Sequence, residues 1–399
     1  MTYALQGLKI IDFGIFFAGP YASKLLADLG AEVIKIEQVT GDPLRRSPGP
    51  FNGCQRNKRA IALDLRTEEG KAVAHKLIAQ ADVLTHNMRP GVAERLGIDY
   101  ETAKSLREDI IYLYSPAFGT VGPRKDQPGF EPLVSALVGI EAAVAGKGNP
   151  PTMTLSSVNM DPGNGLMGAV GIMMALNHRA QTGQGQMIQC PQMVSGMLFT
   201  SEMYYLPDGT LSPQYELDQA QTGFGPMCRL YETSEDWICV VVPTERQFRA
   251  LCGAMGFPSL ANDVRWETTQ ARESSEDLAE ILEGRFKERT AREWFDLLDA
   301  AGVPCEVSAH DGVGMLFENE GNLANGLIAE YWHPTYGTMR EVGETVRLSE
   351  SRGHIWGPPP LIGQHSEEIL AELGYGEEHR RELREQNIVA WPDGVPSQN

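Results

Sequence analysis

The sequence has few cysteines for its length, and none stands in an arrangement typical of a metal site or a disulfide framework. The six cysteines of the 399-residue chain are widely scattered, without a Cys-x-x-Cys pair or a histidine at zinc-ligand spacing. No neighbouring cluster would lower a thiol pKa, so we expect free thiols that pack in the core rather than act as nucleophiles. The sequence therefore predicts no metal site.

Long apolar runs are also missing. No stretch reaches 18 uncharged apolar residues, and the amino terminus has no basic region followed by an uninterrupted apolar segment. The chain is 42% hydrophobic and 22% charged, which is typical of globular proteins, and it is long enough for two domains. We expect a cytoplasmic protein without a membrane span.

Several well-known catalytic motifs are absent. The chain has no Walker A sequence, no Gly-x-Ser-x-Gly elbow and no His-Glu-x-x-His, which disfavours ATP-driven ligation, serine hydrolysis and zinc proteolysis. Residues 12–37 imitate a dinucleotide-binding βαβ unit, but only Gly14 and Gly19 punctuate the loop before Pro20. Without Gly-x-Gly-x-x-Gly we expect no NAD. Free N–H groups at a helix started by Pro20 leave phosphate binding open.

The net charge of −19 argues against a nucleic-acid surface, although the charge is unevenly spread. Between residues 38 and 125, fourteen Lys and Arg stand against ten Asp and Glu, so this segment is positive while the remaining chain is strongly acidic. We call it the basic island. It is suited to a compact polyphosphate, although ordinary solvated helix faces explain several of its charges equally well.

The first hundred residues alternate short apolar strands with amphipathic helices, which predicts an α/β fold with parallel strand pairing. Expected strands are 9–13, 32–37, 60–65, 83–85 and 110–114, and expected helices are 20–29 and 67–79. Residues 115–129 then form a Gly/Pro-rich loop that is too long for a simple turn, which indicates a functional role.

Two segments, 131–144 and 161–179, are apolar almost all round and predict buried helices. The segment 161–179 contains several glycines, which lower its helix propensity. Their presence indicates close approach by a ligand or another helix. Beyond a polar stretch at 212–221 we expect a hairpin over 224–242, helices at 245–255, 275–287 and 290–301, and strands at 330–333 and 341–348. The expected domains are 1–200 for the first part of a large domain, 201–223 as linker, 224–325 as small domain, and 326–399 as a second linker with the rest of the large domain.

Asp161 stands at the start of the second apolar helix and is followed by Pro162. Asp at the N-cap before Pro is a strong helix-start signal, because the carboxylate accepts otherwise unpaired backbone N–H groups. The same N–H groups and the helix dipole favour the ionised, reactive carboxylate. Taken alone, Asp161 is more simply a cap than a nucleophile.

Several segments together resemble the class III CoA-transferase family in the right order along nearly the whole chain. They are residues 5–13, 18–20, 26–37, 57–59, 63–64, 81–83, 87, 90–91, 95–97, 161 with 165 and 171, 179, 182–186 and 360–365. The resemblance implies a Rossmann-like large domain built from both chain ends, a smaller inserted α/β domain, and an interlocked homodimer.

The family's catalytic aspartate falls on Asp161. The implied reaction moves CoA from an acyl-CoA donor to a carboxylic-acid acceptor through mixed-anhydride and aspartyl-CoA thioester intermediates, so coenzyme A enters as substrate. Arg66 and Arg95 are the expected phosphate contacts, since both lie in the basic island. The family's CoA contacts fall on Phe17, Ala18, Leu63, Asp64, Leu65, Arg66, Asn87, Met88, Arg89, Arg95, Phe130 and Glu131.

The sequence departs from formyl-CoA transferase, a member of this family, at Gln38, Phe17 and Phe130, which replace a basic residue, a glutamine and a tyrosine. These changes argue against formyl and oxalate as substrates, and with Phe16 they hint at a larger or more apolar acyl group.

Two alternatives remain. An α-methylacyl-CoA racemase of the same fold uses an aspartate with a histidine, but Phe130 stands where that histidine would be and cannot accept a proton, unless His86 or another residue substitutes. A non-catalytic CoA-binding protein would keep Asp161 only as a cap.

Overall fold

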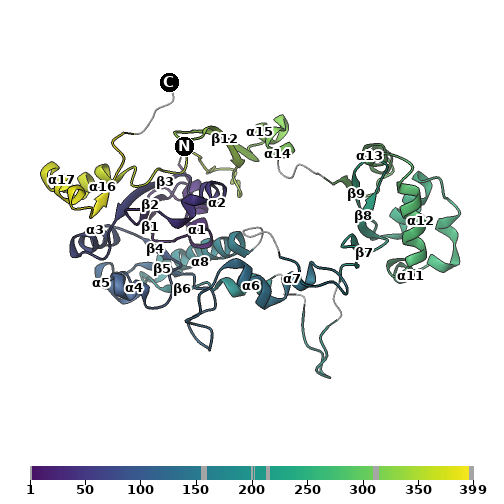
Figure 1. Cartoon of the computed structure of the whole chain (residues 1–399), viewed down its shortest axis with the longest axis horizontal. Coiled ribbons are helices and arrows are strands. Elements are labelled where there is room, and N and C mark those ends of the chain that lie inside the picture. Colours follow the sequence, from purple (N-terminus) through teal and green to yellow (C-terminus); the bar gives the residue numbers. More distant parts are fainter. Residues whose placement is uncertain are drawn as a thin grey trace. The chain divides into compact units, whose positions relative to one another are not determined.

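The computed structural model describes residues 2–153, 160–198, 201, 203–212, 216–308 and 314–394. The chain divides into two compact units, which we describe separately (Figure 1). Unit 1 comprises Met1–Val138, Leu155–Ser201 and Leu316–Asn399, and unit 2 comprises Gly139–Thr154 and Glu202–Met315. Residues 139–154 thus belong with the second unit, a grouping that the sequence analysis did not predict.

Unit 1 is built on a mixed α/β sheet whose strands are mainly parallel. Among the described residues the strand order is β13-β3-β2-β1-β4-β5-β6, with β13 from the carboxy-terminal end antiparallel to β3. The strands are β1 Lys9–Asp12, β2 Glu32–Glu37, β3 Lys58–Leu63, β4 Val83–His86, β5 Ile111–Tyr114, β6 Met187–Gln189 and β13 Val389–Ala390. The parallel α/β expectation is confirmed, and the order from β3 to β6 is that of dinucleotide-binding folds.

Both faces of this sheet are apolar, because successive side chains on a strand point to opposite faces. Ile10 packs in one cluster with α1 and α8, and Ile11 packs in another with α3, α16 and α17. The helices of unit 1 are α1 Ala18–Asp28, α2 Pro48–Gly53, α3 Glu68–Ile78, α4 Val92–Leu96, α5 Tyr100–Leu106, α6 Glu131–Val138, α8 Met160–Thr182, α9 Gln192–Leu198, α14 Gly314–Glu318, α15 Glu320–Ala324, α16 Ser366–Glu372 and α17 Glu377–Glu385.

Helix α8 packs tightly on α1 and the sheet at its glycines. A Cβ atom on Gly165 would lie 2.8 Å from the Tyr21 side chain, and one on Gly168 would lie 3.0 Å from Leu113. The expected close approach is therefore confirmed, and the neighbours are a helix and a strand. This contact fixes the start of α8 beside the start of α1.

Two predicted elements are wrong. The single helix expected over 131–144 is two, α6 and α7 (Ile140–Ala143), because Gly139 adopts a left-handed conformation with φ of +82°. The strand expected at 341–348 is observed at an earlier position, as β12 (Gly337–Val342). It pairs with β11 (Ile328–His333) in a hairpin whose turn lies between residues 333 and 337, and this pairing ends at Val342.

Unit 2 is a small antiparallel sheet with helices packed on it around Tyr231, Phe286 and Trp294. The hairpin expected over 224–242 is confirmed as β8 (Cys228–Glu232) and β9 (Trp237–Val241). The other elements of unit 2 are α7, β7 Gly223–Gly225, α10 Glu245–Ala254, α11 Thr269–Glu273, α12 Glu276–Phe286, α13 Ala291–Ala300 and β10 Cys305–Val307. Within the described part of either unit, no helix has the length and apolar character needed to cross a membrane.

Candidate active site

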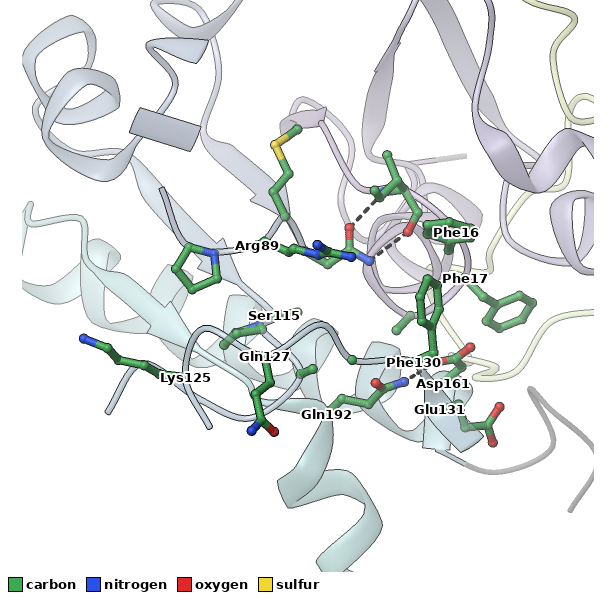
Figure 2. A pocket seen from close by; sticks show the side chains of 18 residues that line it. Phe16, Phe17, Arg89, Ser115, Lys125, Gln127, Phe130, Glu131, Asp161 and Gln192 are labelled. Carbon is green, nitrogen blue, oxygen red and sulfur yellow. Dashed lines mark hydrogen bonds between the residues drawn. The ribbon is translucent and has the colours of Figure 1, made fainter. Parts of the chain in front are cut away.

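A cavity of about 290 Å³ lies in unit 1 at the carboxyl ends of the parallel strands (Figure 2). Its walls are the segments that follow β1, β4, β5 and β6, together with the first turn of α8. The strand order reverses direction between β1 and β4, and in open α/β sheets such a point forms a crevice that binds ligands. The lining residues are Ile15, Phe16, Phe17, Ala18, Asn87, Met88, Arg89, Pro90, Ser115, Pro116, Ala117, Lys125, Gln127, Gly129, Phe130, Glu131, Asp161 and Gln192.

Asp161 is half-buried in this cavity, and its environment raises its pKa to about 7. Burial is the largest cause and the carboxylate of Glu131 adds to it, while a hydrogen bond from Gln192 opposes both. Gln192 Nε2 donates this bond to Asp161 Oδ1 (Figure 2). At neutral pH the side chain is therefore divided between its acidic and ionised forms.

The expected capping geometry is wrong. Helix α8 begins at Met160, so Asp161 lies inside the first turn, and among the described residues the donor to its carboxylate is the Gln192 side chain. The expectation that helix N–H groups would favour ionisation is also overturned. Loss of solvent and the neighbouring Glu131 carboxylate outweigh the helix end, and the pKa rises.

Glu131 begins α6 and is almost fully buried next to the start of α8. Its carboxylate accepts a hydrogen bond from the backbone N–H of Met160 at 3.4 Å. The two helix starts therefore converge, and they place the carboxyl groups of Glu131 and Asp161 in one cavity.

The loop after β1 is clamped by Asn87, which follows β4. Asn87 Oδ1 accepts from the Ile15 N–H at 2.8 Å, and Asn87 Nδ2 donates to the Ile15 carbonyl at 2.7 Å. A Cβ on Gly19 would lie 2.8 Å from Asn87 Cγ, so only glycine allows this approach. Both polar atoms of the Asn87 amide are therefore hydrogen-bonded to the loop, and Asn87 also forms part of the cavity wall.

The next residue of this loop, Phe16, has a φ of +59°, which is uncommon for a bulky side chain and is typical of strained functional loops. Its ring meets Phe130 edge to face, with 5.2 Å between the ring centroids. Phe17 stacks on Tyr21 at 5.1 Å. Aromatic side chains from two separate segments therefore form an apolar wall beside Asp161.

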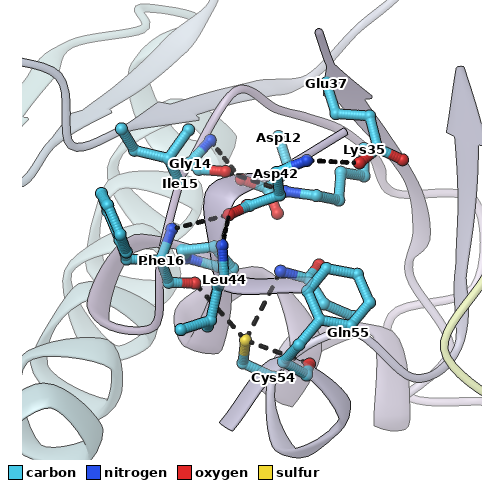
Figure 3. Close-up of polar contacts among 12 residues, drawn as sticks. Asp12, Gly14, Ile15, Phe16, Lys35, Glu37, Asp42, Leu44, Cys54 and Gln55 are labelled. Atoms are coloured by element: carbon cyan, nitrogen blue, oxygen red, sulfur yellow. Dashed lines mark hydrogen bonds and ion pairs between the residues drawn. The ribbon is translucent and has the colours of Figure 1, made fainter. Parts of the chain in front are cut away.

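A buried ionic network holds the same loop in place through Gly14 and Phe16 (Figure 3). Lys35 Nζ donates to the Gly14 carbonyl and to Asp42 Oδ2, both at 2.9 Å, and both side chains of this pair are fully buried. Asp42 Oδ1 accepts from the backbone N–H of Phe16 at 3.4 Å. Burial by itself would lower the Lys35 pKa, but the carboxylates of Asp42 and Asp12 raise it, so the lysine stays charged.

Asp12 forms the second half of this network at the end of β1. It accepts from the Gly14 N–H at 2.8 Å and from Lys58 Nζ at 2.8 Å, and Lys58 also donates to the Pro20 carbonyl. Burial would raise the Asp12 pKa, but Lys58 and Lys35 lower it. The loop that carries Phe16 and Phe17 is therefore anchored at both ends by buried charges.

The cavity brings together Asp161 and seven of the twelve residues expected to contact CoA, and it leaves five aside. The seven are Phe17, Ala18, Asn87, Met88, Arg89, Phe130 and Glu131. Leu63 is buried in β3, Leu65 packs against the core, Asp64 pairs with the exposed Arg66 at 2.7 Å, and Arg95 is exposed on α4.

Much of the basic island has a structural role. Ion pairs join Arg45 to Glu37, Arg56 to Asp28 and Lys58 to Asp12 inside the fold. Two other cations of the basic island, Arg89 and Lys125, line the cavity, and both are exposed.

His86 does not line this cavity and is not a base. Its Nδ1 accepts from the Met88 N–H at 3.2 Å, and its Nε2 lies 2.9 Å from the Tyr112 hydroxyl, which donates to the Ile98 carbonyl. Burial lowers the His86 pKa to about 3. Its ring is therefore neutral with both nitrogens engaged, and it cannot replace the histidine that a racemase needs.

The residue that sequence reasoning missed is Gln192. It follows β6, and the rule that carboxyl ends of parallel strands meet at one edge could have found it once β6 was placed in the sheet.

The fold and the site define an α/β protein with a half-buried carboxylate in the crevice at the switch point of its parallel sheet. Comparison with known proteins identifies its family. The sequence matches CoA-transferase family III over residues 5–366, so the chain belongs to that family and is a class III CoA-transferase.

Relatives with assigned reactions cover nearly the whole chain. It is 30% identical to human (Homo sapiens) succinyl-CoA:glutarate CoA-transferase, over 96% of this chain and 90% of that protein. It is 30% identical to succinyl-CoA--D-citramalate CoA-transferase of Chloroflexus aurantiacus, over 96% and 98%. The crystal structure of a CAIB/BAIF family protein from Brucella suis superposes with a TM-score of 0.81 at 29% identity, covering 94% and 100% of the two chains.

Proposed function

We propose that this chain transfers CoA from an acyl-CoA thioester to a carboxylic acid through covalent intermediates on Asp161. The carboxylate attacks the thioester carbonyl, the C–S bond breaks, and a mixed anhydride and CoA thiolate form. The thiolate attacks the aspartyl carbonyl, which releases the donor acid and leaves an aspartyl-CoA thioester. The acceptor carboxylate then attacks the aspartyl-CoA thioester, which breaks its C–S bond, releases CoA thiolate and forms a second anhydride. The thiolate attacks the acceptor carbonyl of this anhydride, which gives the new acyl-CoA and frees the Asp161 carboxylate.

The observation that carries this proposal is the state of Asp161 in its cavity. A carboxylate with a pKa of about 7 is more basic than a solvated one, and partial burial strips it of water, so its ionised form is a stronger nucleophile. One of its oxygens is held by Gln192. Glu131, the other carboxylate of the wall, is almost fully buried and accepts from a backbone N–H, which suits a supporting role.

Several lining residues suit the rest of the substrate. Arg89 and Lys125 would pair with CoA phosphates, since Arg and Lys are the usual phosphate partners. Phe17, Ala18 and Met88 would contact the arm that carries the thioester. The wall of Phe16 and Phe130 favours an apolar acyl group. The expected CoA contacts at residues 63–66 and at Arg95 stay part of this proposal.

We also propose a homodimer. Apolar side chains are exposed on three helices that contact one another, α6, α8 and α9, and gathered exposed apolar side chains mark interaction surfaces in soluble proteins. They are Leu133, Leu137, Leu166, Val170, Met173, Met174, Val194, Met197 and Leu198. Sedimentation of the purified chain tests this part, and a monomer at micromolar concentration would refute it. The division into a large domain with a small inserted domain, and the cytoplasmic location, stay predictions.

The covalent step is tested by mass spectrometry with Asp161→Ala and a matched control, Asp208→Asn, at an exposed aspartate outside the cavity. Incubation with acyl-CoA should add mass at Asp161 that hydroxylamine removes, and Asp161→Ala should lose both adduct and transfer while Asp208→Asn keeps them. Full transfer by Asp161→Ala would refute the proposal.

The racemase alternative predicts exchange of the α-proton. In heavy water we expect no deuterium uptake into a 2-methylacyl-CoA, because His86 is sequestered and Phe130 is not a base. Rapid uptake would favour the racemase.

A further inference from the structure

Gln192 lines the cavity and is hydrogen-bonded to the proposed nucleophile. It begins α9, is 7% exposed, and carries an amide that neither gains nor loses a proton near neutral pH. A buried polar side chain is normally hydrogen-bonded, so the hydrogen-bond partners of Gln192 indicate its role.

Both ends of Gln192 are fixed. Its backbone N–H donates to the Pro116 carbonyl at 2.9 Å, and the N–H of Met193 donates to the Ala117 carbonyl at 2.9 Å. These bonds fasten the start of α9 to the loop after β5. At the other end, the side-chain Nε2 donates to Asp161 Oδ1 (Figure 2).

The helix that carries Asp161 is fastened to the same place. Asn164, one turn further along α8, donates through Nδ2 to the Cys190 carbonyl at 2.9 Å and to Ser195 Oγ at 3.1 Å. Gly196 lies so close to Met160 that a Cβ there would meet its sulfur at 2.7 Å. The Asp161 carboxylate and the Gln192 amide therefore lie on two helices, α8 and α9, that are held together by hydrogen bonds and close packing.

We propose that Gln192 is a positioning residue for the reaction, whose amide N–H holds Oδ1 of Asp161 so that Oδ2 is presented to the thioester. This inference rests on the proposed function, in which Asp161 is the nucleophile. An N–H donated to one oxygen fixes the plane of the carboxyl group, and orientation of a nucleophile is a large part of its reactivity. The same N–H stabilises the ionised form against burial and against Glu131.

Loss of the amide should therefore have two effects that can be separated by pH. The Asp161 pKa should rise by about one unit, because a hydrogen bond to a charged group is lost. Since the pKa starts at about 7, kcat/KM at pH 7 should fall about fivefold from ionisation alone, and this part should return at pH 9. A further loss of about tenfold that persists at pH 9 would report the lost orientation.

The experiment measures kcat and KM from pH 5 to 9 for wild type, Gln192→Met and Gln192→Glu. Met keeps the length of the side chain and removes the donor. Glu keeps the length and shape of the side chain and adds a negative charge beside Asp161. The acid limb of the profile, where kcat/KM rises with the ionisation of Asp161, should therefore move to still higher pH. Gln184→Met, at an exposed glutamine outside the cavity, is the matched control and should leave the profile unchanged. KM for acyl-CoA should change less than kcat in both cavity variants.

The outcomes separate the two proposals. If wild type forms the Asp161 adduct but neither variant moves the acid limb, the role of Gln192 is refuted and the proposed function stands. Equal loss at every pH by variants that fold normally by circular dichroism would mean a purely structural role and also overturn the inference. If wild type forms no adduct on Asp161, the proposed function itself fails.

Discussion

Replacing Lys35 by methionine should destabilise unit 1 strongly and loosen the cavity, although Lys35 does not line it. The substitution keeps most of the volume of the side chain and removes a fully buried charge that Asp42 and the Gly14 carbonyl share, each at 2.9 Å. Breaking a buried ion pair costs about 3–5 kcal/mol, since one charge stays behind without its partner.

The other hydrogen bonds of Asp42 and Gly14 narrow the expected loss in the free energy of unfolding. Asp42 keeps the backbone N–H groups of Leu44 at 2.9 Å and Phe16 at 3.4 Å, which limits the cost to about 3 kcal/mol. The Gly14 carbonyl loses its donor and adds about 1 kcal/mol. We expect a loss of about 4 kcal/mol in the free energy of unfolding, and about half of it should return in Lys35→Met/Asp42→Asn, which removes the stranded charge.

Urea unfolding followed by hydrogen-exchange mass spectrometry on peptides covering residues 9–37 measures this energy in unit 1 alone. Lys71→Met is the matched control, because Lys71 pairs with Glu68 at the surface and should matter by less than about 1 kcal/mol. The argument would be refuted by a Lys35→Met loss below about 1 kcal/mol, or by a double variant no more stable than the single one.

Two further predictions follow from the site. The folded pKa of Asp161, about 7, lies above the unfolded value of 3.8, so its stabilising contribution is present below pH 4 and is lost as the pH rises through 7. Asp161→Asn should therefore gain stability relative to wild type from pH 4 to pH 8, reaching on the order of 4 kcal/mol in thermal or urea unfolding, because the two pKa values differ by about three units and each unit corresponds to about 1.4 kcal/mol. A stability difference that stays constant with pH would contradict this. Gly19→Ala should raise KM for acyl-CoA about tenfold, because its Cβ displaces Asn87 from Ile15, and small displacements at a binding loop are costly. Gly253→Ala, on an open helix surface, should leave KM unchanged, and equal KM values for both variants would count against the clamp.

The periodicity of the chain was enough to predict the elements that are locally determined. Strand 32–37 was predicted with its observed bounds, and helix 161–179 to within three residues, because their apolar patterns and end signals lie within each segment. The break at Gly139 was missed, since an isolated glycine inside an apolar run does not by itself end a helix.

The candidate site was predictable in part. Asp161 was singled out from its own neighbours, but its capping role and lowered pKa were inferred from a helix start one residue too late. Whether a carboxylate is buried beside Glu131 or held by Gln192 depends on residues about thirty positions away, which no local pattern contains.

Residue types and their order along the chain were sufficient to predict an α/β fold with parallel strands, to single out Asp161 near the start of an apolar helix, and to indicate membership of a CoA-transferase family. The ends of four strands meet around Asp161, Asn87 is hydrogen-bonded to the loop after β1, and Gln192 reaches the Asp161 carboxylate, and none of these contacts could be derived from local sequence patterns. The physical reason is that burial, pKa and hydrogen-bond partners are set by packing between segments far apart in the chain.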